Sequence, residues 1–214
     1  METVLITGAA GDFEKFLAEA FIREGYDTYR LGGAGKGSLS ENLTEARAEL
    51  LGKTDKIDIY IDTADARDSG DAFTIKDGLD ESVIRKLYEK NVLRPMRAME
   101  TFLPLLDAGK GRRVCFLTSA EASVNETEAV SGFGYNLSKA AMHNFFQMVS
   151  NKLTPFGYTM RVYDPRINKA SPRDSAEGAF SYFTRRRGTE GFNPLRDDET
   201  RLVFRDAFGR EHAW

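Results

Sequence analysis

Short apolar runs alternate along the chain with longer segments in which apolar residues recur at helical spacing. This alternation is typical of a parallel β-sheet with helices packed on both faces. We therefore expect an α/β fold, a doubly wound parallel β-sheet flanked by helices, and the length of 214 residues fits a single domain, 1–214. The pattern predicts strands at 3–7, 27–31, 57–62, 113–118, 160–164 and 202–204, and helices at 13–24, 43–51, 80–106, 134–153 and 173–185.

Two segments interrupt this regular pattern. Residues 32–40 are rich in glycine and serine and stand where another crossover helix would be expected, so they predict an exposed loop. Pro95 lies inside the predicted helix 80–106. Because proline lacks a backbone donor and its ring clashes with the preceding turn, we expect this helix to bend there.

Composition and charge argue against several classes of function. The net charge is −3 and the basic residues are scattered among acids, so no nucleic-acid partner is expected. The one tight basic cluster, 185–187, is interpreted as a solvated helix end or loop. Cys115 is the single cysteine and lies in a predicted strand, which leaves no disulfide framework and no cysteine-rich metal site. His143 and His212 stand far apart, and we expect neither to be a metal ligand or a base.

The chain carries no signal for a membrane or for secretion. No stretch of about 18 apolar residues occurs, so no membrane-spanning helix is expected. The first strand-like run follows Met1 and Glu2 directly, without the basic region, long apolar segment and cleavage site of a secretory leader. With a single cysteine, these features predict a cytoplasmic protein.

A glycine-containing loop links the first predicted strand to the first predicted helix. Strand, glycine turn and helix start together place free backbone N–H groups where they can hold a pyrophosphate. The alternative is a strand-to-helix turn that binds nothing. On the first interpretation, the candidate cofactor-binding residues of this segment are Thr7, Gly8, Ala10, Gly11 and Phe13.

A second group of residues suggests proton chemistry. Tyr135 and Lys139 are four residues apart in a predicted helix and therefore share a face. A phenol with a pKa near 10 needs a positive neighbour to exchange protons at neutral pH, and Lys139 would be that neighbour. Ser119 follows the predicted strand 113–118, and Asn91 lies in the preceding helix. Structural roles are the alternative: a helix-surface pair, a strand end and the cap of a kink.

In order and in element type, Asn91, Ser119, Tyr135 and Lys139 resemble the catalytic tetrad of the short-chain dehydrogenase/reductase family. The resemblance implies a Rossmann-like fold in which Tyr135 is the acid/base and Lys139 lowers its pKa and contacts the cofactor. It further implies that Ser119 anchors the substrate oxygen and that Asn91 holds a water of a proton relay. The end of the chain, from 206 to 214, looks like that of small reductases related to the bacterial C-factor group.

The cofactor side of the family pattern is altered. The family's loop, Thr-Gly-x-x-x-Gly-x-Gly, here has Asp12 and Glu14 at its later glycine positions, and their carboxylates oppose a pyrophosphate. The related spacing Thr-Gly-x-x-Gly accommodates Gly11. The family's Asn-Asn-Ala-Gly appears as 62–65, where the alanine, Ala64, survives as a candidate cofactor contact.

The substrate side also departs from the pattern. The interval from Ser119 to Tyr135 is a few residues long for the family and contains Glu121, Glu126 and Glu128, which predict an acidic lip over the site. The family's Pro-Gly is Pro165–Arg166, and Arg166 would close the pocket, bind an anion or lie in an exposed turn. The segment 167–172 is a very short lid, so a small or open substrate site is expected.

Two functions from different classes remain open at this stage. The first is an NAD(P)-dependent oxidoreductase, a short-chain dehydrogenase/reductase that reduces a small carbonyl compound or oxidises the matching alcohol. Within it, Gly11 and backbone amides could compensate for the altered loop. The second is a non-catalytic binding or regulatory protein of the same fold, with impaired dinucleotide binding. The tetrad favours the first, and the second is favoured by Asp12, Glu14, Asp62, Asp65 and Arg166.

Cofactor preference and assembly follow weaker signals. Arg30 and Lys36 flank the end of the second strand, which favours NADP slightly over NAD. The helices 80–106 and 134–153 should pack across a two-fold axis, as the family's do, and give a homodimer or homotetramer. Phe145, Phe146 and Met148 fit such an interface but could equally be core residues.

Overall fold

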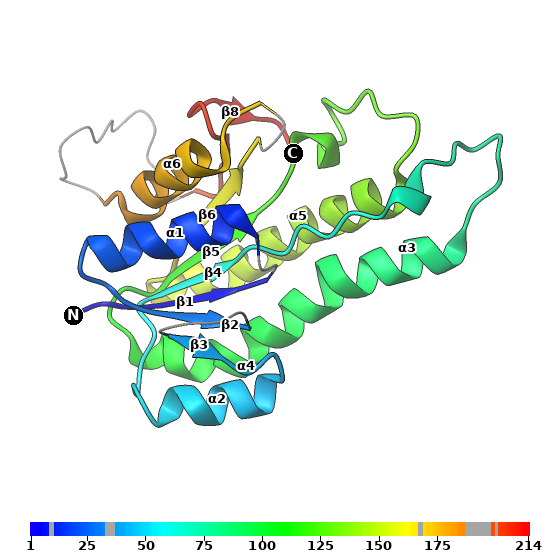
Figure 1. Cartoon of the computed structure of the whole chain (residues 1–214). Coiled ribbons are helices and arrows are strands. Elements are labelled where there is room, and N and C mark those ends of the chain that lie inside the picture. Colours follow the sequence, from blue (N-terminus) through cyan, green and yellow to red (C-terminus); the bar gives the residue numbers. More distant parts are fainter. Residues whose placement is uncertain (9–10, 33–36, 167–168, 187–197, 200) are drawn as a thin grey trace.

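The computed structural model describes residues 1–8, 11–32, 37–166, 169–186, 198–199 and 201–214 (Figure 1). Through these residues runs an eight-stranded sheet in the order β3-β2-β1-β4-β5-β6-β7-β8. All neighbouring strands are parallel except β7 and β8, which are antiparallel. The strands are β1 (Thr3–Thr7), β2 (Asp27–Leu31), β3 (Ser38–Leu39), β4 (Ile59–Asp62), β5 (Arg113–Leu117), β6 (Thr159–Asp164), β7 (Phe204–Asp206) and β8 (Glu211–His212). The expected α/β fold with a doubly wound, mostly parallel sheet is confirmed.

The central strands β1, β4 and β5 are buried throughout and largely apolar because both of their faces are covered. In β1, Val4 and Ile6 contribute to one apolar cluster and Leu5 to the other, as the alternation of side chains across a sheet requires. β5 divides in the same way, with Phe116 on one side and Cys115 on the other. The core therefore consists of two layers, one on each face of the sheet.

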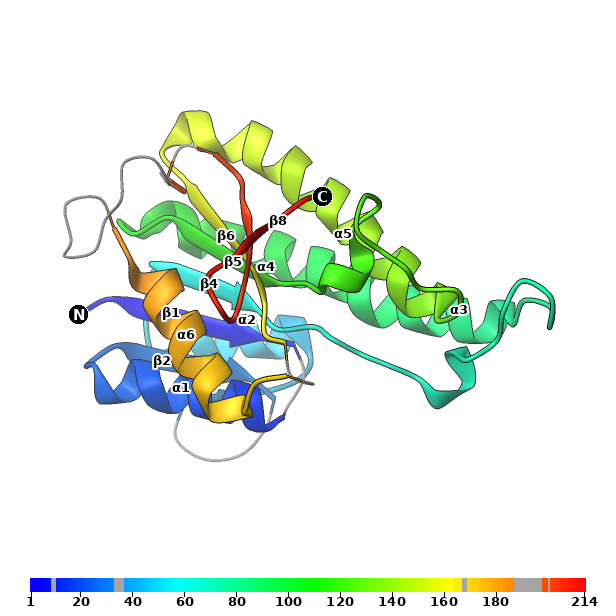
Figure 2. The ribbon, with the colours of Figure 1, turned by 90° about the horizontal axis from the view of Figure 1, so that it is seen from above.

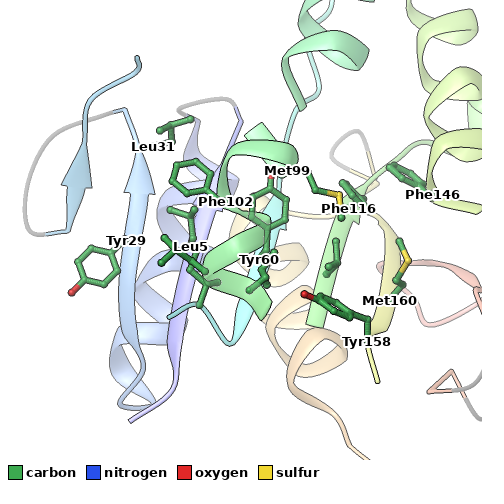
Figure 3. Packing of buried hydrophobic residues seen from close by; sticks show 14 of the residues in the cluster. Leu5, Tyr29, Leu31, Tyr60, Met99, Phe102, Phe116, Phe146, Tyr158 and Met160 are labelled. Atoms are coloured by element: carbon green, nitrogen blue, oxygen red, sulfur yellow. The ribbon is translucent and has the colours of Figure 1, made fainter. Parts of the chain in front are cut away.

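Helices α1 (Asp12–Arg23) and α6 (Pro172–Thr184) cover one face, and α2 (Leu43–Leu51), α4 (Arg94–Ala108) and α5 (Phe133–Leu153) cover the other (Figures 1 and 2). On the second face, Phe102 of α4 packs beside Leu5 and Tyr60, and Phe146 of α5 stacks on Phe116 with ring centroids 4.2 Å apart (Figure 3). None of the helices in the described ranges combines the length and the apolar character needed to cross a membrane.

The long helix predicted at 80–106 is interrupted close to Pro95, where the sequence suggested a bend. Helix α3 (Glu81–Tyr88) passes through a π-helical turn, η2 (Glu89–Leu93), into α4. Pro95 occupies the first turn of α4, where its missing N–H is tolerated. A π turn widens the helix by one residue per turn and is frequent at functional sites. This one contains Asn91.

The sequence placed most elements to within two residues, with two corrections. Residues 32–40 were expected as an exposed loop, but Ser38 and Leu39 form β3 and pair with Arg30 and Leu31 of β2. Burial of Leu39 stabilises this short edge strand. The last parallel strand lies at Phe204–Asp206 instead of 202–204, because its partner register pairs Val162 with Phe204. The β7–β8 hairpin was not expected.

The carboxyl ends of β1, β4, β5 and β6 meet at one edge of the sheet, where the strand order reverses on either side of β1 and β4. In open α/β sheets, ligands bind outside the strand ends at such a reversal. The segments that leave this edge are the turn after Thr7 and the residues following Asp62, Leu117 and Asp164. These segments carry the polar residues that the sequence singled out.

Candidate active site

Two hollows lie side by side along the carboxyl edge of the sheet. The first, of about 170 Å³, is lined by Thr7, Gly8, Leu31, Asp62, Ala64, Asp65, Ala66, Lys90, Arg94, Pro95 and Ala98. The second, of about 370 Å³, is lined by Asp65, Arg67, Thr118, Ser119, Ala120, Glu121, Tyr135, Asp164, Pro165, Arg166 and Lys169. Asp65 lines both.

Tyr135 is placed by the start of α5. Gly132, with φ of 75°, turns the chain into the helix, and Asp71 from the segment after β4 accepts hydrogen bonds from the backbone N–H groups of Gly134 and Tyr135, both at 2.8 Å. A carboxylate at a helix N-terminus satisfies free donors and interacts favourably with the helix dipole. Asp71 therefore fixes the turn that carries Tyr135.

Lys139 lies one turn further along α5 and is buried. Its ammonium group donates to the carbonyl oxygens of Ala64, at 2.5 Å, and of Leu117, at 3.4 Å. It also lies 3.1 Å from Oδ1 of Asp65. Lys139 thus ties α5 to the ends of β4 and β5.

Ser119 follows β5 and lines the second hollow together with Tyr135. Its Oγ accepts a hydrogen bond from the Glu121 N–H at 3.2 Å and caps the short 3-10 turn Ala120–Ala122. The phenol of Tyr135 is within reach of the Ser119 hydroxyl, which acts to lower its pKa. Ser119, Tyr135 and Lys139 are therefore brought together as the sequence predicted.

Asn91 is also nearby, but its side chain is engaged with the protein. Its Oδ1 accepts from the Ala66 N–H at 2.7 Å, and its Nδ2 donates to the Ala66 carbonyl at 2.9 Å and to the Ser138 hydroxyl at 3.0 Å. Both amide hydrogens are thus donated to protein oxygens. In this arrangement the side chain of Asn91 braces the segment after β4 and has no hydrogen left for the water expected from the family pattern.

Asp65 occupies the centre of the group. Its Oδ1 accepts the Tyr135 hydroxyl at 2.6 Å as well as facing Lys139. The guanidinium of Arg67 stacks on the Tyr135 ring at 3.8 Å from its centroid, with Nε 3.9 Å from Oδ2 of Asp65. Arg67 pairs at 3.2 Å with Glu121, from the lip of the second hollow.

These contacts reverse one expectation. Burial raises the pKa of Tyr135 well above its usual value of about 10, and the Asp65 carboxylate raises it further, against the opposing effects of Arg67 and Ser119. The pKa of Asp65 is lowered: burial opposes this, but Lys139, the Tyr135 hydroxyl and Arg67 outweigh it. Lys139 was expected to lower the pKa of the phenol, but here its charge is shared with Asp65, and Tyr135 stays protonated.

Comparisons with known proteins support the fold assignment. No protein-family model matches the chain. Over 129 residues it is 27% identical to an uncharacterised oxidoreductase of Saccharomyces cerevisiae, a match of 60% of this chain that spans only about half, 49%, of that relative. Over 139 residues it is 26% identical to the C-signal protein of Myxococcus xanthus, covering 64% of this chain and 81% of that protein.

Solved structures match along the whole chain. A protein from Burkholderia multivorans, assigned as a short-chain dehydrogenase/reductase and solved with NADP, superposes with a TM-score of 0.75 at 20% identity, covering 100% of this chain and 99% of that one. The chain has the fold of a short-chain dehydrogenase/reductase. A carbonyl reductase from Pseudomonas aeruginosa in complex with NADP gives a TM-score of 0.75 at 19% identity and full coverage of both chains. The family resemblance expected from the sequence is confirmed.

The predicted cofactor residues of this short-chain dehydrogenase/reductase fold divide into two groups. Thr7, Gly8 and Ala64 line the first hollow. Gly8 has φ of 120°, and a Cβ there would lie 2.6 Å from the Ala64 nitrogen, so only glycine fits. Gly11 is the N-cap of α1, and the side chain of Phe13 is buried in the core against α6; neither lines the hollow. Ala10 and Lys36 lie outside the described residues.

The acids at the family's glycine and asparagine positions behave differently from one another. Asp12 is exposed in the first turn of α1, whereas Glu14 is buried and its pKa is raised, mainly by burial, to about 7. Near neutral pH, Glu14 therefore opposes a pyrophosphate less than its sequence position suggested. Asp62 accepts hydrogen bonds from Thr7 Oγ1 at 2.7 Å and from the Ala64 N–H at 2.9 Å, so it holds the strand ends together.

The acidic lip is largely paired. Glu121 contacts Arg67, and Glu126 accepts from His212, at 2.7 Å, and from the Ala213 N–H, which fastens β8 to the lip. Arg166 has φ of 48°, in the left-handed region that favours the family's glycine, and its guanidinium lies against Asp164 and His212. Among the described residues, no group of acids, histidines and cysteine is suited to a metal, and residues 167–168 of the expected lid fall outside them.

Three residues that contact Tyr135 were not expected from the sequence: Asp65, Arg67 and Asp71. Asp65 was noted as an irregularity at a family glycine, which was the available signal. Arg67 lies in an irregular stretch and Asp71 ends the three-residue 3-10 turn Ser69–Asp71, and neither has a periodic pattern that would have indicated a contact with α5.

Proposed function

We propose that this protein is an NAD(P)-dependent oxidoreductase that reduces a small carbonyl compound or oxidises the matching alcohol. The observation that carries the proposal is the convergence of Ser119, Tyr135 and Lys139 at the carboxyl edge of the sheet, beside a hollow next to Thr7, Gly8 and Ala64. A serine donor, a phenol and a lysine in reach of one cavity form a site for proton exchange with an oxygen atom.

The residues around the first hollow fit a nicotinamide dinucleotide. Within the described part of the chain, no side chain caps the N-terminus of α1, so its first backbone N–H groups are available to a phosphate. The exposed cations Lys90 and Arg94 line the hollow and suit a phosphate group. A bound dinucleotide would supply the hydride. With Arg30 at the end of β2, these cations favour NADP.

The chain's own residues would then divide the work. Ser119 donates a hydrogen bond to the substrate oxygen and stabilises the charge that develops there. Tyr135, which stays protonated in this arrangement, supplies the proton to that oxygen in the reductive direction. Lys139 orients α5 against the ends of β4 and β5, and its positive charge stabilises the Tyr135 phenolate that forms when the phenol gives up its proton.

The second hollow indicates a small, polar substrate. Its volume is about 370 Å³, and its lining includes Arg67, Glu121, Asp164 and Arg166. An apolar substrate would cover these charged groups and remove them from water, which costs binding energy. The similarity to the carbonyl reductase of Pseudomonas aeruginosa supports the same substrate class.

We also propose that the protein forms a homodimer through α4 and α5. A wide apolar groove runs between these helices, lined among others by Met96, Leu103, Phe145 and Met148. The side chain of Met148 is 64% exposed, whereas Phe146 is fully buried in the core. A second copy offers the same surface, as two-fold symmetry requires.

Titration of the purified protein with NADPH and NADH, followed by nicotinamide fluorescence and thermal shift, tests the proposed function. A ligand that binds only the folded state stabilises it by about 2.7 kcal/mol at a hundredfold excess over its Kd, so micromolar binding is expected to be plainly visible. The control variant, Tyr135→Phe, should still bind the dinucleotide and fail to turn over any carbonyl compound. Absence of binding at millimolar concentration would refute the proposal in favour of a non-catalytic binder of this fold.

A further inference from the structure

Asp65 stands at the junction of the two hollows. Among the described residues that line either hollow, it alone lines both. The first hollow holds the candidate dinucleotide residues Thr7 and Gly8, and the second holds Ser119 and Tyr135. Any ligand that extends from one hollow to the other must pass this carboxylate.

The carboxylate occupies the polar groups on which the proposed reaction depends. Its Oδ1 accepts a 2.6 Å hydrogen bond from the Tyr135 hydroxyl and lies 3.1 Å from the ammonium of Lys139. A phenol that donates to Asp65 cannot at the same time donate to a substrate oxygen, because it has one hydrogen. The arrangement therefore satisfies Tyr135 and Lys139 internally.

The position of Asp65 is built by its neighbours on both sides. The N–H of Ala64 donates to Asp62 and its carbonyl accepts from Lys139, while both backbone groups of Ala66 are bonded to the side chain of Asn91. With residues 64 and 66 both fixed by buried side chains, the carboxylate between them is directed at Tyr135. Its own side chain remains 18% exposed, toward the hollows.

We propose that Asp65 is a latch on Tyr135 and Lys139, and that its carboxylate must leave this pair before a dinucleotide and a substrate can occupy the two hollows together. The proposal rests on the proposed oxidoreductase function for its ligand, but the latch itself is a contact of this chain alone. Arg67 offers the carboxylate a second partner, since its Nε lies 3.9 Å from Oδ2 and half of its side chain is exposed.

Dinucleotide affinity tests the latch without relying on turnover. The parent protein, Asp65→Asn and Asp65→Gly are titrated with NADPH by isothermal calorimetry. Asparagine keeps the size and removes the charge, whereas glycine removes both. We expect both variants to bind NADPH on the order of ten- to hundredfold more tightly than the parent, because the charge-assisted contacts of the Asp65 carboxylate with Tyr135 and Lys139 no longer compete with the ligand. Asp77→Asn, which loses an exposed aspartate bonded to Thr74, should bind like the parent.

The ionisation of Tyr135 tests the latch without any ligand. Around the phenol lie Asp65 and Arg67 after β4, Ser119 after β5 and Lys139 on α5. Ultraviolet difference titration of each protein against its Tyr135→Phe counterpart isolates this phenol. Asp65→Asn should lower the pKa of Tyr135 by about one unit or more, since the adjacent negative charge is gone.

The two measurements separate the latch from the proposed function. An unchanged titration of Tyr135 in Asp65→Asn, or equal NADPH affinity in all three proteins, overturns the latch while leaving the oxidoreductase proposal standing. A shifted titration without binding of NADPH or NADH in any variant supports the contact of Asp65 with Tyr135 and refutes the oxidoreductase function. A shifted titration with tighter binding supports both.

Discussion

Asp71 should contribute more to the free energy of unfolding of this protein than an ordinary helix N-cap does. Its carboxylate, only 5% exposed, accepts two backbone N–H groups of α5 at 2.8 Å from more than 60 residues away. Loss of an N-cap costs about 1 kcal/mol, and hydrogen bonds to a charged group inside a fold contribute about 1.5–3 kcal/mol. We therefore expect Asp71→Ala to lower the free energy of unfolding by about 2–4 kcal/mol.

Asp80→Ala is the matched control. Asp80 also caps a helix, α3, with bonds of 2.9 Å and 3.3 Å to the N–H groups of Ser82 and Val83, but it is exposed and lies away from the hollows. Its loss should cost about 1 kcal/mol. Urea unfolding followed by circular dichroism measures both values, and similar dependence on urea in the two variants keeps them comparable.

The functional consequence distinguishes positioning from stability alone. Because Asp71 fixes the turn that carries Tyr135, its removal should also lower carbonyl reduction by at least about tenfold at a temperature where the variant is folded. Asp80→Ala should keep the parent rate. If Asp71→Ala is no more destabilising than Asp80→Ala and reacts at the parent rate, the argument that Asp71 positions Tyr135 is wrong.

Three further outcomes follow from the same structure. Burial raises the pKa of Glu14 from 4.5 to about 7, so the folded state holds this proton more tightly and the free energy of unfolding falls as pH rises between those values. Relative to the parent, Glu14→Gln should gain roughly 2–3 kcal/mol in free energy of unfolding at pH 8 and nothing at pH 4. An equal gain at both pH values would contradict this. Ser119→Ala should lose about 10²–10³ in kcat with NADPH affinity unchanged by calorimetry, and a weakened affinity would count against its assigned place. Met148→Glu should shift the protein from dimer to monomer in light scattering, whereas Ile75→Glu, equally exposed outside the groove, should not.

Much of the fold could be predicted because buried parallel strands carry continuous apolar runs. β1, β2 and α2 have the bounds that the sequence gave reason to expect. β3 was missed because two residues paired through their backbones leave no side-chain pattern. The β7–β8 hairpin escaped for the same reason.

Some residues of the candidate site could likewise be predicted from the sequence, and others could not. Tyr135, Lys139 and Ser119 could be predicted because their spacing and their elements follow the family motif. Asp65 and Asp71 could not, because their contacts with Tyr135 span 70 and 64 residues and arise where an irregular segment folds back on α5. The effect of Asp65 on the phenol depends on this contact, which explains why the sequence suggested a lowered pKa for Tyr135 and the structure gives a raised one.

Transfer of deuterium tests the central claim most directly. The protein is incubated with NADPH that carries deuterium at the transferable position and with a panel of small polar carbonyl compounds, and the alcohols are examined by mass spectrometry. With the parent protein, the product alcohol should carry deuterium on its carbinol carbon. With Tyr135→Phe, no deuterated alcohol should form. If no compound of the panel acquires deuterium with the parent or with Asp65→Gly, or if Tyr135→Phe transfers it equally well, the proposed reaction is contradicted.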